Sequence, residues 1–149
     1  MKTKISVIFI GLVMLFAGCE SESESQSLTF TMGNVCGWCA GSDSIVITSD
    51  KTIYTSYNPC DQKGEKSIYK TSAEDWDKLT SLFNHAKFEK IYVNSCNVCV
   101  DGCDNWIRVE NGDFKHEIRF GYSDSTILKP IKEFVEKLNY EKSKYSSSD

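Results

Sequence analysis

Cysteine is the residue type in this chain whose spacing could carry chemistry. Cys36 and Cys39 form one C-x-x-C motif, Cys96 and Cys99 form a second, and Cys103 follows closely. A C-x-x-C pair acts as a redox dithiol when a helix N-terminus or a cation stabilises one of its thiolates. Because a strand pattern rather than a helix follows the first motif, the sequence favours a structural disulfide there over redox catalysis.

The same two motifs could also bind a metal ion. Cys36, Cys39, Cys96 and Cys99 would provide the four sulfur ligands of a tetrahedral zinc site. The segment between the motifs is far longer than in a zinc ribbon, and two further cysteines would remain without a role. Thiol–disulfide oxidoreduction and metal binding therefore stand as alternatives to a structural role for these cysteines.

Apart from the cysteines, few residues suggest catalysis. His85 and His116 are the only histidines; we expect His85 near the end of a helix and His116 on the apolar side of a hairpin. Asp101 and Asp104 lack the spacing of a calcium-binding loop. Neither a nucleophile elbow nor a phosphate-binding glycine loop occurs. The sequence identifies no catalytic residue and no cofactor, and it favours a non-catalytic module that binds a small ligand or an envelope protein.

The N-terminal residues predict export and lipidation. A short basic start precedes an apolar run over residues 5–16, which is too short to span a bilayer but fits the core of a signal peptide. Ala17, Gly18 and Cys19 then resemble the lipobox of bacterial lipoproteins, in which the cysteine receives a diacylglyceryl group. The resemblance implies a signal peptide over residues 1–18 and an outer-membrane anchor at Cys19, on the periplasmic side or the cell surface. An ordinary secreted protein is the alternative.

Charge and compartment narrow the function further. The signal holds two of the 17 basic residues and none of the 21 acidic ones, so the mature charge is 15 − 21 = −6. This balance argues against a nucleic-acid partner, which needs a clustered basic surface. The cell envelope is oxidising, so the remaining cysteines predict three disulfides with 15 possible pairings. These disulfide candidates are Cys36, Cys39, Cys60, Cys96, Cys99 and Cys103.

The elements that must position the cysteines follow from the apolar pattern. Residues 19–27 contain mostly Glu and Ser after Cys19 and predict a flexible acidic tether. A single domain follows over residues 28–141, with a polar tail over residues 142–149. Alternation within the domain predicts strands at 28–32, 45–47, 52–57 and 66–70. Ser72, with Asp75 three residues later, predicts the N-terminal cap of a helix.

The second half of the domain predicts a hairpin and a closing helix. Asn111 and Gly112 suit a two-residue type I′ turn, which would place Val109 opposite Phe114. A helix is expected over residues 127–140, with Pro130 in its first turn. The order of elements predicts an α+β two-layer sandwich. Its sheet is mainly antiparallel, two helices cover one face, and disulfides staple its loops.

This topology also predicts where the cysteines lie. The loop with Cys36 and Cys39 joins two strands at one end of the sheet, and the next strand returns Cys60 to the same end. We expect the loop of Cys96 to Cys103 to fold onto this end. A bond between the two loops closes a long segment and constrains the unfolded chain more than a local C-x-x-C bond does. At least one long-range disulfide is therefore expected.

Residues 28–138 resemble small uncharacterised bacterial envelope domains. Those domains contain a strand, a tight C-x-G-x-C turn, a hairpin, a helix, another hairpin and a closing helix. Gly37 and Cys39 match the second half of the turn, whereas Val35 stands where its first cysteine belongs and Ala40 replaces a usual proline. The resemblance implies an envelope location and no known activity.

Overall fold

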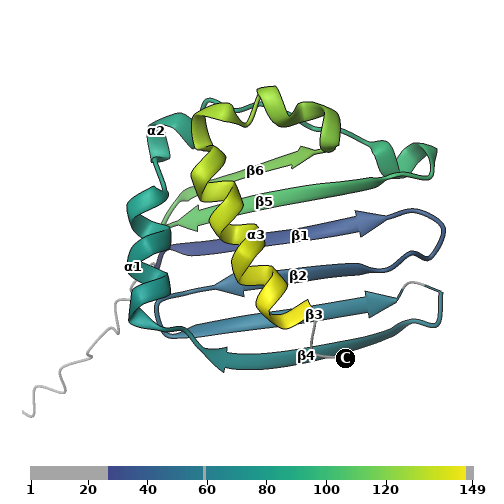
Figure 1. Cartoon of the computed structure of the whole chain (residues 1–149), viewed down its shortest axis with the longest axis horizontal. Coiled ribbons are helices and arrows are strands. Elements are labelled where there is room, and N and C mark those ends of the chain that lie inside the picture. The colour runs from purple at the N-terminus through teal and green to yellow at the C-terminus, as the bar shows by residue number, and fades with distance from the viewer. Residues whose placement is uncertain (1–26, 59, 147–149) are drawn as a thin grey trace, which may run out of the picture.

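The computed structural model describes residues 27–58 and 60–146. The expected signal peptide, the lipidation site Cys19 and nearly all of the tether lie outside these residues. Six antiparallel strands form one sheet in the order β4-β3-β2-β1-β5-β6 (Figure 1). Their bounds are β1 Thr29–Cys36, β2 Ser42–Ile47, β3 Lys51–Asn58, β4 Lys63–Lys70, β5 Cys103–Asn111 and β6 Phe114–Phe120.

The helices cover one face of this sheet. Figure 1 shows α1 and α3 in front of the strands, with α3 running diagonally across them from β6 towards β3. This arrangement confirms the expected α+β architecture with helices on one face. Among the described residues, no helix is long and apolar enough to cross a membrane. The helical bounds are α1 Ala73–Leu82, α2 His85–Phe88, η1 Asn97–Val100, η2 Tyr122–Thr126, η3 Lys129–Ile131 and α3 Lys132–Ser146.

The core lies between the sheet and the helices. Phe30 and Met32 on β1 are fully buried, as the alternation of this strand predicts. Phe30 contacts the rings of Phe83 and Phe134, with centroids 5.3 and 5.2 Å apart. These edge-on contacts join β1 to the end of α1 and to α3. The middle of the sheet is therefore fixed under the helices.

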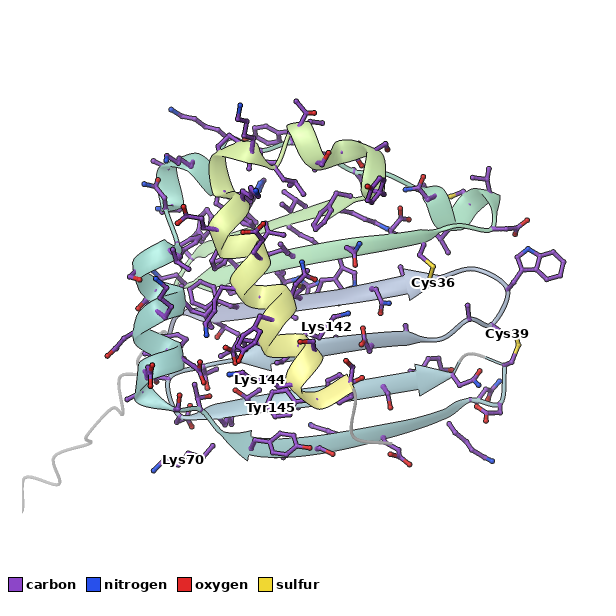
Figure 2. All side chains as sticks on the ribbon, in the orientation of Figure 1. Cys36, Cys39, Lys70, Lys142, Lys144 and Tyr145 are labelled. Carbon is purple, nitrogen blue, oxygen red and sulfur yellow. A yellow bond between two sulfur atoms is a disulfide. The ribbon has the colours of Figure 1, made fainter. Side chains whose placement is uncertain are left out.

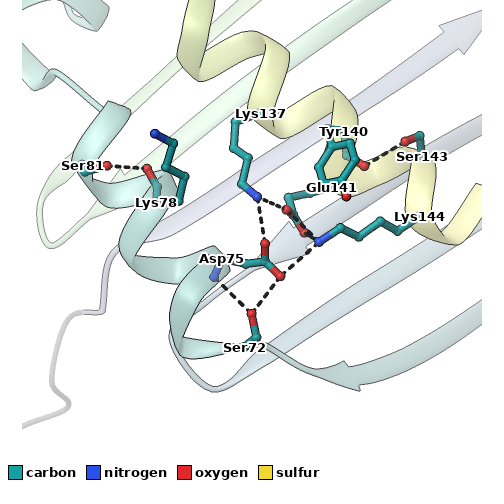
Figure 3. Close-up of polar contacts among 9 residues, drawn as sticks. All are labelled: Ser72, Asp75, Lys78, Ser81, Lys137, Tyr140, Glu141, Ser143 and Lys144. Atoms are coloured by element: carbon teal, nitrogen blue, oxygen red, sulfur yellow. Dashed lines mark hydrogen bonds and ion pairs between the residues drawn. The ribbon is translucent and has the colours of Figure 1, made fainter.

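A polar network also joins α1 to α3 (Figure 3). Ser72 caps α1 as expected, because its hydroxyl accepts the N–H of Asp75 at 3.1 Å. The Asp75 carboxylate in turn binds the ammonium groups of Lys137 at 2.8 Å and Lys144 at 3.0 Å. Burial opposes ionisation, but the hydrogen bonds from Lys137, Ser72 and Lys144 outweigh it and hold the pKa of Asp75 well below its usual range. The C-terminal part of α3 is thus tied to the start of α1.

The structure corrects the expected hairpin turn. The two turn residues are Gly112 and Asp113, and Val109 lies opposite His116 rather than Phe114. Gly112 has a φ of 63° while Asp113 has no positive φ, a pattern that fits a type II′ turn with glycine first. A displacement of two residues keeps every side chain on its expected face, because side chains alternate with a period of two.

The structure also corrects the closing helix. Tyr122–Thr126 and Lys129–Ile131 form short 3-10 turns, and the α-helix starts only at Lys132. Pro130 lies in the second of these turns, since it has no N–H to continue an α-helical ladder. The helix then continues to Ser146 and includes residues 142–146 of the expected polar tail.

His85 is a smaller correction. It begins α2 instead of ending α1, because the Asn84 side chain accepts the N–H of Lys87 at 3.0 Å and caps a new helix.

Candidate binding site at the disulfide end of the sheet

Three disulfides cross-link the loops at one end of the sheet. The pairs are Cys36–Cys103, Cys39–Cys60 and Cys96–Cys99, with sequence separations of 67, 21 and 3 residues. All six expected cysteines are therefore paired, and the expected long-range disulfide exists between β1 and β5. Figure 2 shows Cys36 and Cys39 at the end of the sheet that lies away from α1. We call this region the disulfide end.

The β1–β2 loop is held on both sides by disulfides. Cys36 is the register partner of Cys103, and the N–H of Gly37 donates to the carbonyl oxygen of Gly102 at 3.0 Å. Trp38 and Cys39 have φ angles of 48° and 61°, which bulky residues rarely adopt. Such a conformation persists only where surrounding structure imposes it. The cross-links thereby hold Trp38 in solvent, where its side chain is 81% exposed.

Asp104 anchors the second cysteine loop. Its fully buried carboxylate accepts the backbone N–H groups of Asn97 and Val98 at 2.9 and 3.2 Å, and it pairs with Arg119 at 3.2 Å. Burial opposes ionisation, but these N–H groups, the Asn97 amide and Arg119 outweigh it and lower the pKa of Asp104. Asp104 lies at the start of β5, and its carboxylate therefore positions η1 together with the Cys96–Cys99 disulfide.

A polar row crosses the sheet beside the disulfide end. Asn34, Asp43, Ser56 and Glu65 are successive register partners on β1, β2, β3 and β4. They point to the same face as the core residues Met32 and Ile45, since they lie two positions along their strands. The strands extend past the C-terminal end of α3 at this end of the sheet (Figure 1), and the row is not buried: Asn34, Asp43 and Ser56 are partly exposed and Glu65 is exposed.

The row and the adjoining loops enclose a groove of about 490 Å³. Asp43 lies at its floor, where it binds the ammonium group of Lys142 at 2.5 Å and the hydroxyl of Tyr54 at 3.3 Å. Figure 2 shows Lys142 on the C-terminal part of α3. The residues that line the groove are Asn34, Ala40, Gly41, Ser42, Asp43, Ser56, Tyr57, Asn58, Asp61, Lys63, Gly64 and Glu65.

Several polar atoms in the groove have no protein partner among the described residues. Asn34 uses its side-chain oxygen to accept the N–H of Asp43 at 2.8 Å, and its amide nitrogen makes no hydrogen bond within the described residues. The Ser56 hydroxyl makes no hydrogen bond within the described part of the chain. Donors and acceptors that are positioned by a rigid sheet but remain unpaired are suited to bind a polar ligand.

The structure does not bring the first C-x-x-C motif together as a dithiol. Cys36 and Cys39 bind different partners, so only Cys96 and Cys99 close a local C-x-x-C disulfide. Cysteine sulfurs in disulfides are not thiolate ligands, and the residues of 27–58 and 60–146 contain no group of three or more metal-ligating side chains.

Sequence reasoning missed the groove, although a signal for it exists. Asn34 and Ser56 are polar residues at inward-facing positions of their strands, and Asp43 is another at the start of β2. Polar residues at inward positions on neighbouring strands indicate a part of the sheet that no helix covers. His116 is placed as expected, with its Nε2 atom 2.8 Å from the carbonyl oxygen of Ile91.

No protein-family model matches this chain, and no curated protein is significantly similar to it.

Proposed function

We propose that this protein is a lipid-anchored binding module of the bacterial cell envelope. Cys19 attaches it to the outer membrane, and the groove at the disulfide end binds a ligand or an envelope partner. The observation that carries the proposal is the uncovered polar row of Asn34, Asp43, Ser56 and Glu65, bordered by loops that two long-range disulfides cross-link. A rigid, partly unsatisfied polar surface is the usual basis of a preformed binding site.

The disulfides support an envelope location for this module. Disulfides persist in oxidising compartments and are rare in the cytoplasm. The lipobox-like sequence at Ala17 to Cys19 and the acidic tether that follows it agree with display at a membrane surface. Binding is also favoured over thiol chemistry at the first motif, because Cys36 and Cys39 are each committed to a distant partner.

The anchor is tested by substitution of the lipidated residue. Cys19→Ala should shift the protein from the detergent phase to unprocessed precursor and remove the diacylglyceryl mass from its N-terminal peptide. Ser21→Ala is the matched control, because it also introduces an alanine close to the anchor but leaves the lipobox and all three disulfides intact. A wild-type protein found entirely in the soluble fraction, without a lipid mass, would contradict the anchor.

The groove is tested by two substitutions on one strand. Ser56→Arg places a long side chain in the groove, whereas Thr55→Arg places the same side chain on the opposite face of β3. The full-length protein is immobilised and exposed separately to envelope polysaccharide, peptidoglycan fragments and envelope proteins. The wild type and Thr55→Arg should retain one fraction, and Ser56→Arg should retain at least tenfold less. Equal retention by both variants, or no retention by the wild type, would overturn the proposal.

A further inference from the structure

We infer that the ligand of the groove is a neutral oligosaccharide, an inference that rests on the binding function proposed above. Three features of the disulfide end lead to it: the mixture of hydrogen-bonding groups, the near balance of charge, and an exposed aromatic ring in the loop that borders the groove. Each feature is set by residues of the groove or of the loop that borders it.

The hydrogen-bonding groups match those of a sugar. Every sugar hydroxyl both donates and accepts, so a complementary surface presents donors and acceptors side by side. The groove offers the amide nitrogen of Asn34 as a donor, the Glu65 carboxylate as an acceptor, and the Ser56 hydroxyl as both. Asn58 adds its amide nitrogen as a donor, because its side-chain oxygen accepts the N–H of Cys60. The four residues of the polar row lie on successive strands and span about 14 Å, the length of a di- or trisaccharide.

The charges of the groove argue for a neutral ligand. Lys142 neutralises Asp43 at the floor. Asp61 and Glu65 are negative and Lys63 is positive, so the remaining lining carries nearly balanced charge. The described lining contains no arginine, the residue that usually recognises phosphate or carboxylate groups with two parallel hydrogen bonds. A strongly charged ligand would therefore find no complementary field here.

One exposed aromatic ring in the bordering loop provides the apolar part of such a site. Trp38 is 81% exposed and lies in the same loop as Ala40 and Gly41, which line the groove. The C–H faces of a sugar ring stack on the electron-rich faces of aromatic side chains. Covering an exposed indole removes apolar surface from water and so favours binding. The left-handed backbone at Trp38 and Cys39 holds this ring outside the core, where it remains exposed.

A protein partner fits these observations less well. The centre of a protein–protein interface is usually apolar and packed, with aromatic or arginine anchors surrounded by polar residues. Here most of the lining residues are polar, and the exposed Trp38 ring belongs to the loop that borders the groove.

The experiment uses the full-length protein in a detergent without a sugar headgroup, because a glycoside detergent would compete for the site. Neutral oligosaccharides, including glucans, mannans, galactans, xylans and chitin fragments, are screened on an array, and the strongest is titrated by NMR and calorimetry. We expect dissociation constants in the micromolar to millimolar range. Trp38→Ala should weaken binding about tenfold, Trp38→Phe should retain most of it, and Ser56→Arg should abolish it. Tyr122→Ala is the control, since it removes a 99% exposed ring that does not line the groove.

The outcomes separate this inference from the function on which it rests. Binding of a neutral oligosaccharide that depends on Ser56 and Trp38 supports both. Retention of a protein or peptide fraction that Ser56→Arg abolishes, with no neutral oligosaccharide bound at millimolar concentration, upholds the groove and overturns the sugar. Sugar binding that is equal in Ser56→Arg and the wild type also overturns it, because the ligand then lies elsewhere.

Discussion

Removal of the disulfides one at a time should destabilise the domain in the order of the loops that they close. A disulfide restricts the unfolded chain, and in the chain-entropy model its contribution grows with the logarithm of the loop length. Cys36–Cys103 closes 67 residues and should contribute about 4 kcal/mol, Cys39–Cys60 closes 21 and should contribute about 3 kcal/mol, and Cys96–Cys99 closes 3 and should contribute about 2 kcal/mol.

The folded structure preserves this order. Loss of Cys36–Cys103 removes a cross-link between register partners of β1 and β5, but both strands keep their backbone pairing. Loss of Cys96–Cys99 leaves η1 attached, because Asp104 still binds the N–H groups of Asn97 and Val98. Removal of either disulfide leaves no cavity in the core, because both lie at the exposed end of the sheet. The loop-length term should therefore dominate.

The assay is urea denaturation of the three double-alanine variants, prepared as exported protein with the other disulfides intact. The variants lacking Cys36–Cys103 and Cys96–Cys99 should differ by about 2 kcal/mol in free energy of unfolding, a large part of the total for a small domain. The denaturant slope should rise as cross-links are removed, because the unfolded chain expands. Equal losses for these two variants would refute the reasoning, and so would a larger loss for Cys96–Cys99.

The other predictions concern a buried carboxylate, a glycine and the local disulfide. Because the pKa of Asp104 is lower in the folded state than in the unfolded state, its carboxylate stabilises the fold above the unfolded pKa of about 4. This contribution to stability is lost as the pH falls through the folded pKa. The destabilisation by Asp104→Asn, measured in urea, should therefore shrink below about pH 4. Gly33→Ala should lower stability by about 1–3 kcal/mol in the same assay, because its Cβ would lie 2.7 Å from the Trp106 ring and from the Asp43 carbonyl oxygen. A mild dithiol should reduce Cys96–Cys99 with the least loss of folded structure, which alkylation and peptide mapping would detect.

Local patterns in the sequence predicted the parts of the fold that local physics determines. Alternation placed Phe30 and Met32 in the core, and the Ser72 cap placed the start of α1. The hairpin faces were also right, although its register was displaced by two residues. A face depends only on parity, whereas a register depends on the turn, and Gly112 serves equally well as the first or second residue of a tight turn.

Long-range contacts determine the parts that the sequence left open. The α3 helix continues beyond Tyr140 because Lys142 binds Asp43 and Lys144 binds Asp75, and each pair joins residues far apart in the chain. The pairing of the cysteines has the same cause. Cys36 pairs with Cys103 because β5 aligns antiparallel with β1, and the spacing of the cysteines in the sequence does not predict that alignment.

The groove depends on both kinds of information, which explains why it was not found first. A strand pattern shows that Asn34 and Ser56 point inward, but inward means buried only where a helix lies above the strand. Helix α3 leaves the end of the sheet uncovered. Lys142, near the C-terminus of this helix, binds the carboxylate of Asp43 in the polar row. The inward polar residues are therefore neither defects of the core nor ordinary surface. They lie where the strands extend beyond helix α3, and the disulfides keep that end of the sheet rigid enough to bind a ligand.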